Sequence, residues 1–138
     1  MRVERKGFYT PEILLQAVRV KIRETIDRGE SIDYLTFVPD GEPTLDINLG
    51  TTIDLLKGLE IPIAVISNAS LITREDVRRD LLSADWVSLK VDAVQDTIWK
   101  QVDRPHGSLD LDQILNGITS FAASFKGELT TETMLIRD

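Results

Sequence analysis

Residues 33–45 read DYLTFVPDGEPTL and decide the fold. The short apolar run at 34–38 has the length and composition of a buried β-strand, and it ends in a loop of Pro, Asp, Gly and Glu residues. Open α/β sheets and βα barrels bind their ligands where such strands end. The stretch therefore predicts an α/β fold with a polar loop at the carboxyl edge of its sheet.

Composition sets wide limits on the function. The chain has 138 residues, the length of one domain, and 42% of them are hydrophobic. Its formal net charge of −7 argues against a broad nucleic-acid surface, which would have to neutralise phosphates. No apolar run is long enough for a membrane span, and no secretory signal is present, so we expect a cytoplasmic protein. Without cysteine, the chain can form neither disulfides nor thiolate metal sites.

Helical and strand patterns alternate along the whole chain. Thr10 and Pro11 have the residue types of a helix start, and Asp110 with Gln113 forms a capping-box pattern. The expected elements are a helix between Thr10 and Gly29, a strand at 34–38, a helix with apolar residues from Ile47 to Leu59, a strand at 62–67, a helix capped by Thr73, a strand at 86–91, a helix at 93–102, a helix between Asp110 and Gly127, and a strand at 128–136.

The order α-β-α-β-α-β-α-α-β predicts a parallel sheet with right-handed crossovers. The strand at 62–67 is almost entirely apolar, as is typical of parallel strands covered on both faces. The pattern opens on a helix and closes on a strand. We therefore expect one domain, residues 1–138, whose first strand is missing.

Polar residues follow each predicted strand, and in a parallel sheet these strand ends converge on one edge. Carboxylates there accept hydrogen bonds from an ammonium group, Ser and Asn serve a ribose, and Lys pairs with a carboxylate. A loop with the only histidine, His106, follows the third strand and could reach the same edge. The candidate binding residues are Asp40, Gly41, Glu42, Pro43, Thr44, Ser67, Asn68, Lys90 and Asp92.

Five blocks carry a resemblance to a known family. They read TFVPDGEPTL, AVISNASLI, REDVRRDLLSADWVSLKVDA, RPHGSLDLDQILNGI and ELTTETMLI, in this order over nearly the whole chain. Together they resemble the radical S-adenosylmethionine (radical SAM) superfamily, and within it the iron–sulfur oxidoreductases related to wybutosine-type tRNA-modifying enzymes. Each block alone is weakly specific.

The resemblance implies a partial parallel βα barrel that binds S-adenosylmethionine and a [4Fe-4S] cluster. In the family a Gly-Gly-Glu-type turn contacts the methionine amino group, and here Asp40, Gly41 and Glu42 stand at that turn. By position, Ser67, Asn68, Lys90 and Asp92 would contact the ribose and carboxylate. The family's three cluster cysteines are absent, so the resemblance places the cluster only in a longer parent protein, and this chain alone would be inactive.

Two other functions fit the same residues. One is a cysteine-free module that binds a nucleoside or S-adenosylmethionine without radical chemistry. The other is an unrelated hydrolase or aldolase whose divalent metal is held by Asp40, Glu42, Asp92 and His106. The substrate, a small molecule or an RNA, is not indicated by the sequence.

Several single residues have specific expectations. Lys90 lies in an apolar strand and needs a charged partner, either Glu42 or Asp92, because an unpaired buried ammonium is costly. His106 is interpreted as a loop residue, and Arg5 and the charges at 74–80 as solvated surface. The strands at 34–38 and 128–136 should form bare sheet edges, which predicts self-association through one of them.

Overall fold

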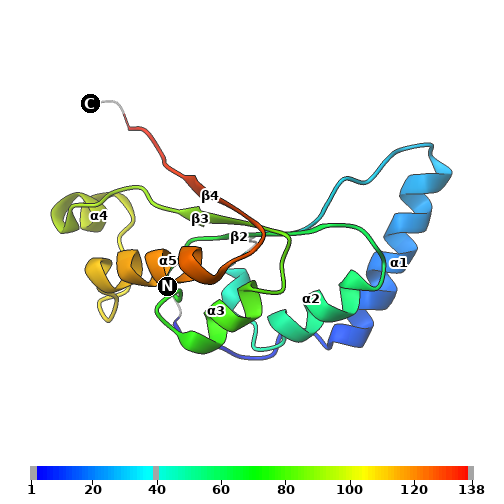
Figure 1. Cartoon of the computed structure of the whole chain (residues 1–138), viewed down its shortest axis with the longest axis horizontal. Coiled ribbons are helices and arrows are strands. Elements are labelled where there is room, and N and C mark those ends of the chain that lie inside the picture. Colours follow the sequence, from blue (N-terminus) through cyan, green and yellow to red (C-terminus); the bar gives the residue numbers. More distant parts are fainter. Residues whose placement is uncertain (1–2, 39–40, 137–138) are drawn as a thin grey trace.

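The computed structural model describes residues 3–38 and 41–136, which form helices packed on a four-stranded sheet (Figure 1). The order agrees with the expected alternation and adds one short 3₁₀ helix. The elements are α1 (Pro11–Asp27), β1 (Leu35–Phe37), the 3₁₀ helix η1 (Pro43–Leu45), α2 (Leu49–Lys57), β2 (Ile63–Ser67), α3 (Glu75–Leu81), β3 (Trp86–Lys90), α4 (Asp96–Val102), α5 (Leu111–Ser124) and β4 (Glu128–Glu132).

The sheet is parallel throughout, with the strands in the order β1-β2-β3-β4. Phe37 pairs with Val65, and Val65 with Val87, so neighbouring strands are in register over their apolar positions. The prediction of a parallel α/β fold is confirmed. All four carboxyl ends lie at one edge, as the candidate site requires. The partial barrel stays a prediction.

One face of the sheet carries the helices. In Figure 1, α2, α3 and α5 lie together on one side of the strands, while α1 packs beside α2. Because side chains alternate along a strand, Val65, Val87 and Leu89 point into the core under these helices. The other face carries Trp86 and several polar residues, including Ser88 and Thr130, which lie side by side in register. The described helices that cover the sheet thus lie on one of its faces.

The core joins the three covering helices to the sheet. Phe121 of α5 is fully buried and lies stacked on Phe125, with 4.8 Å between ring centroids. The remaining large, fully buried aliphatic side chains come from α2, α3, the strands and the segment between β2 and α3, and they are Leu49, Ile53, Ile63, Val65, Ile72, Val77, Leu81, Val87 and Leu89. This continuous cluster holds the carboxyl edge of the sheet in place.

Several element ends differ from the sequence prediction. β1 and β4 are shorter than the runs at 34–38 and 128–136, and α4 begins three residues later than expected. Thr73 does not cap α3, which begins after Arg74. Thr10 does stand at the N-cap of α1, but its side chain makes no capping hydrogen bond. Asp110 does cap α5, accepting from the N–H of Gln113 at 2.9 Å.

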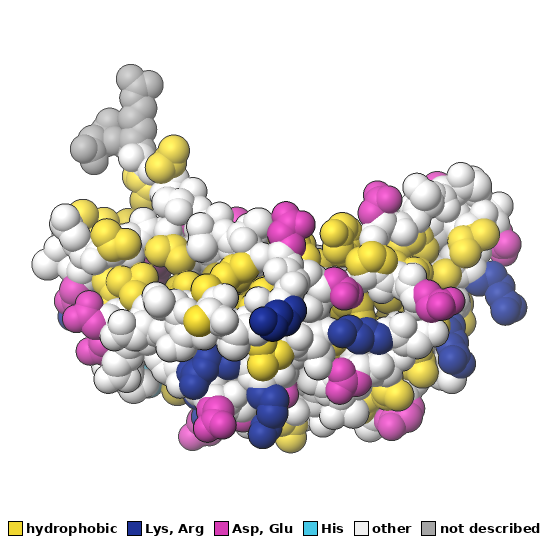
Figure 2. Space-filling model, viewed as in Figure 1, with side chains coloured by type: hydrophobic (Ala, Val, Ile, Leu, Met, Phe, Trp, Pro, Cys, Tyr) yellow, Lys and Arg dark blue, Asp and Glu magenta, His cyan; other side chains and the backbone are white. Residues whose placement is uncertain are grey.

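Helix α1 lies at the edge of the molecule and is largely solvent-exposed. Ala17 and Ile26, expected on its buried face, are exposed, and so are Ile13 and Val20. Figure 2 shows hydrophobic side chains gathered in the dip between this helix and the sheet. No helix in the described part of the chain has the length and hydropathy to cross a bilayer.

Arg5 is a buried anchor, which corrects its assignment to a solvated face. Its guanidinium contacts the carboxylates of Asp76 and Asp80 in α3, the first at 2.8 Å. It also donates to the carbonyls of Thr44 and Asp46, at 2.8 and 2.7 Å. Only 6% of the Arg5 side chain is exposed. One side chain thus ties η1, just after the Gly41 loop, to the helical layer.

Replacing Arg5 with Met should destabilise the fold. We expect Arg5→Met to lower the free energy of unfolding by about 3 kcal/mol, because Asp80 and two carbonyls lose their partner and Asp76 keeps only Arg74. Hydrogen bonds from Arg74 and Arg5 hold the pKa of Asp76 well below its usual value. This stabilisation is present above about pH 4 and is lost as the pH falls further. The difference in the free energy of unfolding between the unmodified chain and Arg5→Met should therefore shrink in acid.

Chemical denaturation at several pH values measures this effect. Arg28→Met is the control, because Arg28 forms an exposed ion pair with Glu30 and should change stability by less than about 1 kcal/mol. Equal effects of the two substitutions on the free energy of unfolding at neutral pH would show that the Arg5 contacts stabilise the fold no more than an exposed ion pair.

Self-association remains a prediction. The outer edges of β1 and β4 pair with no other strand in residues 3–38 and 41–136. Met134, Leu135 and Ile136 follow β4 with exposed apolar side chains, the second of them 92% exposed. Bare edges and exposed apolar residues favour pairing between copies. Light scattering over a concentration series should therefore show dimers, and a constant monomer mass would refute the prediction.

Candidate functional site

The carboxylate of Glu42 connects the ends of β1 and β2. Its Oε1 accepts from the Thr44 N–H at 3.2 Å, the Thr44 hydroxyl at 2.7 Å and the Ser67 hydroxyl at 2.7 Å. Its Oε2 accepts from the Asn68 N–H at 2.8 Å. A carboxylate has about four acceptor positions, two on each oxygen. Oε1 is therefore saturated, while Oε2 keeps acceptor capacity.

The loop after β2 has a special backbone conformation at Ala69. This residue has φ of 60°, the left-handed region that a non-glycine residue rarely adopts. Two local hydrogen bonds hold it: the Ala69 N–H donates to Ser67 Oγ at 3.1 Å, and the Ser70 N–H donates to Asn68 Oδ1 at 2.9 Å. Since Ser67 is itself bonded to Glu42, the loop conformation depends on that carboxylate.

Lys90 and Asp92 form an ion pair at the end of β3. Lys90 Nζ lies 2.7 Å from Asp92 Oδ2, and it makes a longer 3.4 Å contact with Asp103. Asp92 Oδ1 accepts from the Met134 N–H at 2.7 Å, which links β3 to the chain after β4. The expectation that Lys90 pairs with Glu42 or Asp92 is confirmed for Asp92. The Asp92 side chain is fully buried, whereas 42% of Lys90 is exposed.

The two carboxylates near Lys90 have opposite pKa shifts. Burial acts to raise the pKa of Asp92, but hydrogen bonds from Lys90 and Met134 outweigh it and the pKa is lowered. Burial also raises the pKa of Asp103, and the neighbouring Asp92 raises it further. The hydrogen bond to Asp92 raises the pKa of Lys90. Asp92 thus carries the charge that pairs with Lys90.

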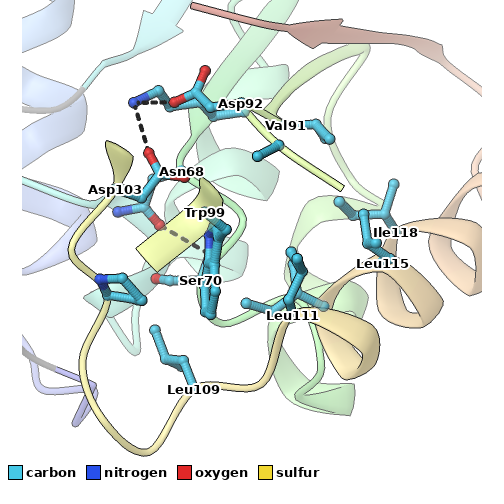
Figure 3. Close-up of a pocket in the computed structure, with 14 residues that line it drawn as sticks. Asn68, Ser70, Val91, Asp92, Trp99, Asp103, Leu109, Leu111, Leu115 and Ile118 are labelled. Carbon is cyan, nitrogen blue, oxygen red and sulfur yellow. Dashed lines mark hydrogen bonds and ion pairs between the residues drawn. The ribbon is translucent and has the colours of Figure 1, made fainter. Parts of the chain in front are cut away.

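Two hollows lie at this edge of the sheet, and Asn68 lines both. The larger one, about 690 Å³, lies between the Gly41–Glu42 turn and the start of α1, with Phe37 and Leu49 among its walls. The smaller one, about 150 Å³, lies between the ends of β2 and β3 and helices α4 and α5. Figure 3 shows the smaller hollow, with Asp92, Asp103 and Asn68 at its polar side.

The predicted site residues are brought together only in part. Gly41, Glu42, Pro43 and Asn68 line the larger hollow, and Asn68, Lys90 and Asp92 line the smaller. Thr44 and Ser67 are buried and bind Glu42 rather than facing either hollow. Asp40 lies outside the described residues. These placements show proximity, and a role in ligand binding stays a prediction.

His106 lies in the loop between α4 and α5. Its Nδ1 lies 2.8 Å from the Ser108 hydroxyl, and the ring lines neither hollow at the strand ends. No group of three His, Asp or Glu side chains within residues 3–38 and 41–136 could hold a metal ion. The proposed metal set of Asp40, Glu42, Asp92 and His106 therefore has no support from the described members.

Asp103 and Trp99 were missed at the smaller hollow. Both come from α4 and the residue that ends it, beyond the short loop that follows β3. Reasoning from strand ends could not find them, because the fold of α4 against α5 sets their position. Their one sequence signal is an aromatic and an acid on a short helix directly after β3.

Comparisons with known proteins give three informative similarities. The chain is 52% identical over 134 residues to a UPF0026 protein of Methanocaldococcus jannaschii, covering 97% of this chain and 41% of that protein. It is 37% identical to a GTPase Obg of Brachyspira hyodysenteriae, in an alignment that covers 86% of this chain and 18% of that protein. It is 31% identical to an S-adenosylmethionine-dependent nucleotide dehydratase of a Thermoplasmatales archaeon, in an alignment that covers 55% of this chain and 31% of that protein. No family model matches the chain.

These findings correct the family prediction. The relatives are designated UPF0026 protein, GTPase Obg and nucleotide dehydratase, and none as a radical SAM or iron–sulfur oxidoreductase. Iron–sulfur clusters require cysteine thiolates, and this chain has none, so the residues present do not fit a [4Fe-4S] cluster. The radical SAM, iron–sulfur, metal-binding and oxidoreductase assignments are therefore wrong. The dehydratase keeps S-adenosylmethionine as a ligand to consider.

Replacing Glu42 with Gln should loosen the strand-end loops. A Gln amide has one acceptor oxygen and one donor group, so at least one of the four donors around Glu42 loses its partner. We expect Glu42→Gln to lower the free energy of unfolding by about 2 kcal/mol. Chemical denaturation measures it, with the exposed Glu24→Gln as a control that changes stability by less than about 0.5 kcal/mol. Indistinguishable variants would show that the Glu42 contacts contribute nothing to stability.

Proposed function

We propose that this chain is a module that binds a nucleoside or S-adenosylmethionine at the carboxyl ends of β1, β2 and β3. The observation that carries the proposal is the Glu42 network, which fixes two polar loops beside a hollow of about 690 Å³. Gly41, Glu42, Asn68, Lys90 and Asp92 are the proposed binding residues, and Asp40, which precedes Gly41 in the sequence, is proposed with them. No radical step is part of the proposal.

The chemistry of these groups matches the ligand class. An amino-acid portion has an ammonium, for which Glu42 Oε2 has acceptor capacity, and a carboxylate, for which Lys90 is a cation at the same edge. Asn68 stands between the two hollows with a side-chain amide, a group suited to ribose hydroxyls. The relative named an S-adenosylmethionine-dependent nucleotide dehydratase supports the choice of ligand.

The arrangement of layers supports a further part of the proposal, namely that the four strands are an arc of a βα barrel. Helices α2, α3 and α5 lie on one side of the strands, as on the outside of a barrel (Figure 1). The opposite face carries Ser88 bonded to Glu132 at 2.7 Å, with Thr130 in the same row. The chain spans about two fifths of its UPF0026 relative, 41%, so the activity of a longer protein is also a proposal.

Calorimetric titration with S-adenosylmethionine tests the proposed function. We expect binding to the unmodified chain, and about tenfold weaker binding to Lys90→Met, because the ligand carboxylate loses its cationic partner. Lys57→Met, an exposed change at the end of α2, is the control and should leave the affinity unchanged. Absence of binding at millimolar S-adenosylmethionine would refute the proposal.

A further inference from the structure

The smaller hollow has a different character from the rest of the strand-end region. One side consists of apolar side chains from α5 and the α4–α5 loop, and the indole of Trp99 forms part of the wall between this side and Ser70 (Figure 3). The opposite side carries Asn68, Ser70, Asp92 and Asp103. An apolar cavity with a few convergent polar groups is the usual form of a small-molecule site.

Its size and its walls limit what could enter. A volume of about 150 Å³ equals that of an engineered apolar cavity that takes up benzene. Trp99 is 7% exposed, so its ring belongs to the wall rather than to the outer surface. A flat ring can lie against an indole with favourable stacking. The cavity therefore suits a small flat aromatic ring system better than an aliphatic chain or a sugar.

The polar side favours a ring that donates hydrogen bonds. Asp92 contacts Lys90 through Oδ2 and the Met134 N–H through Oδ1, whereas Asp103 has a longer 3.4 Å contact with Lys90 and lies beside the Asp92 carboxyl. The Asp103 side chain is 20% exposed and lines the cavity, so its carboxylate can accept from a ligand. Asn68, which also lines the cavity, accepts from the Ser70 N–H through Oδ1, so its amide nitrogen keeps its donor capacity.

We propose that this cavity is a subsite for a nucleobase that bears an exocyclic amino group, adenine or cytosine, whose amino group donates to Asp103. The inference rests on the proposed function, since Asn68 joins the cavity to the larger hollow and one nucleoside-type ligand can extend into both. A keto base would place a carbonyl oxygen against a carboxylate, leaving two acceptors facing each other without a proton between them.

Titrations with adenosine and inosine test the subsite, because these nucleosides differ in the amino and keto groups at one ring position. We expect adenosine to bind at least about tenfold more tightly than inosine, because inosine would leave a polar contact unsatisfied. Asp103→Asn should remove most of this preference, since an amide can both donate and accept. Equal affinities of the unmodified chain for the two nucleosides would overturn the assignment of an amino-bearing base.

A cavity-filling substitution tests the location. Ala93 lines the cavity, and Ala93→Phe should weaken adenosine binding about tenfold or more by occupying the space of the ring. The neighbouring Val94 is 69% exposed and lies outside the cavity, so Val94→Phe is the matched control and should bind like the unmodified chain. Thermal unfolding of each variant shows whether Ala93→Phe is folded. Unchanged binding by a folded Ala93→Phe would overturn the location.

Tryptophan fluorescence gives a readout that does not need Ala93→Phe to fold. The chain has two tryptophans, so Trp86→Phe leaves Trp99 as the only one. Adenosine stacked in the cavity should change the Trp99 emission in a saturable way, and a Trp99 emission that is unchanged while adenosine binds would overturn the location.

The outcomes separate the subsite from the proposed function. S-adenosylmethionine binding that is insensitive to Ala93→Phe would keep the proposed function and reject the subsite. Adenosine binding that depends on Ala93, without any binding of S-adenosylmethionine, would keep the subsite and restrict the ligand to a nucleoside. Absence of binding by both ligands would reject both.

Discussion

The hydrogen bonds to the Glu42 carboxylate are the constraint on which the strand-end region depends. They join the loop after β1 to the first residues after β2, two segments that are 25 positions apart in the chain. Ser67 in turn accepts a hydrogen bond from the Ala69 N–H. The left-handed backbone of Ala69 costs free energy, and these contacts hold it in place. A negatively charged acceptor is suited to this work, since hydrogen bonds to a charged group are stronger than neutral ones.

Two further charged groups complete the frame around this centre. Arg5 fixes the far side of η1 to α3, so the chain on both sides of Glu42 is tied to the core. Lys90 and Asp92 do the same for the end of β3, where the Met134 N–H extends the contact to the chain after β4. Each strand end is thus held by a charge and a backbone group. Such a frame keeps polar groups oriented around the two hollows before any ligand arrives, which reduces the cost of binding.

The sequence was sufficient for the order of the elements and the parallel sheet, because apolar periodicity and strand-end loops are local signals. It also indicated Glu42, Asn68, Lys90 and Asp92 as neighbours, since parallel strands end at one edge. It failed at Arg5, whose partners Asp76 and Asp80 are more than 70 positions away and become visible only in the folded chain. A strand such as β2 is apolar at nearly every position, so its pattern alone does not reveal which face of the sheet the helices cover. The radical SAM assignment rested on five short sequence blocks that are each weakly specific, and the chain has no thiolates to hold the cluster that the assignment implied.

The most direct test of the central claim is a heteronuclear NMR titration of the isotope-labelled chain with S-adenosylmethionine. If the Glu42-centred loops form a ligand site, the largest shift changes fall on the backbone amides of Gly41, Thr44, Asn68 and Asp92. The amides of the C-terminal half of α1, which lines neither hollow, should then change little. Changes centred on the C-terminal half of α1, or no saturable changes at all, would contradict a binding role for the strand ends held by Glu42.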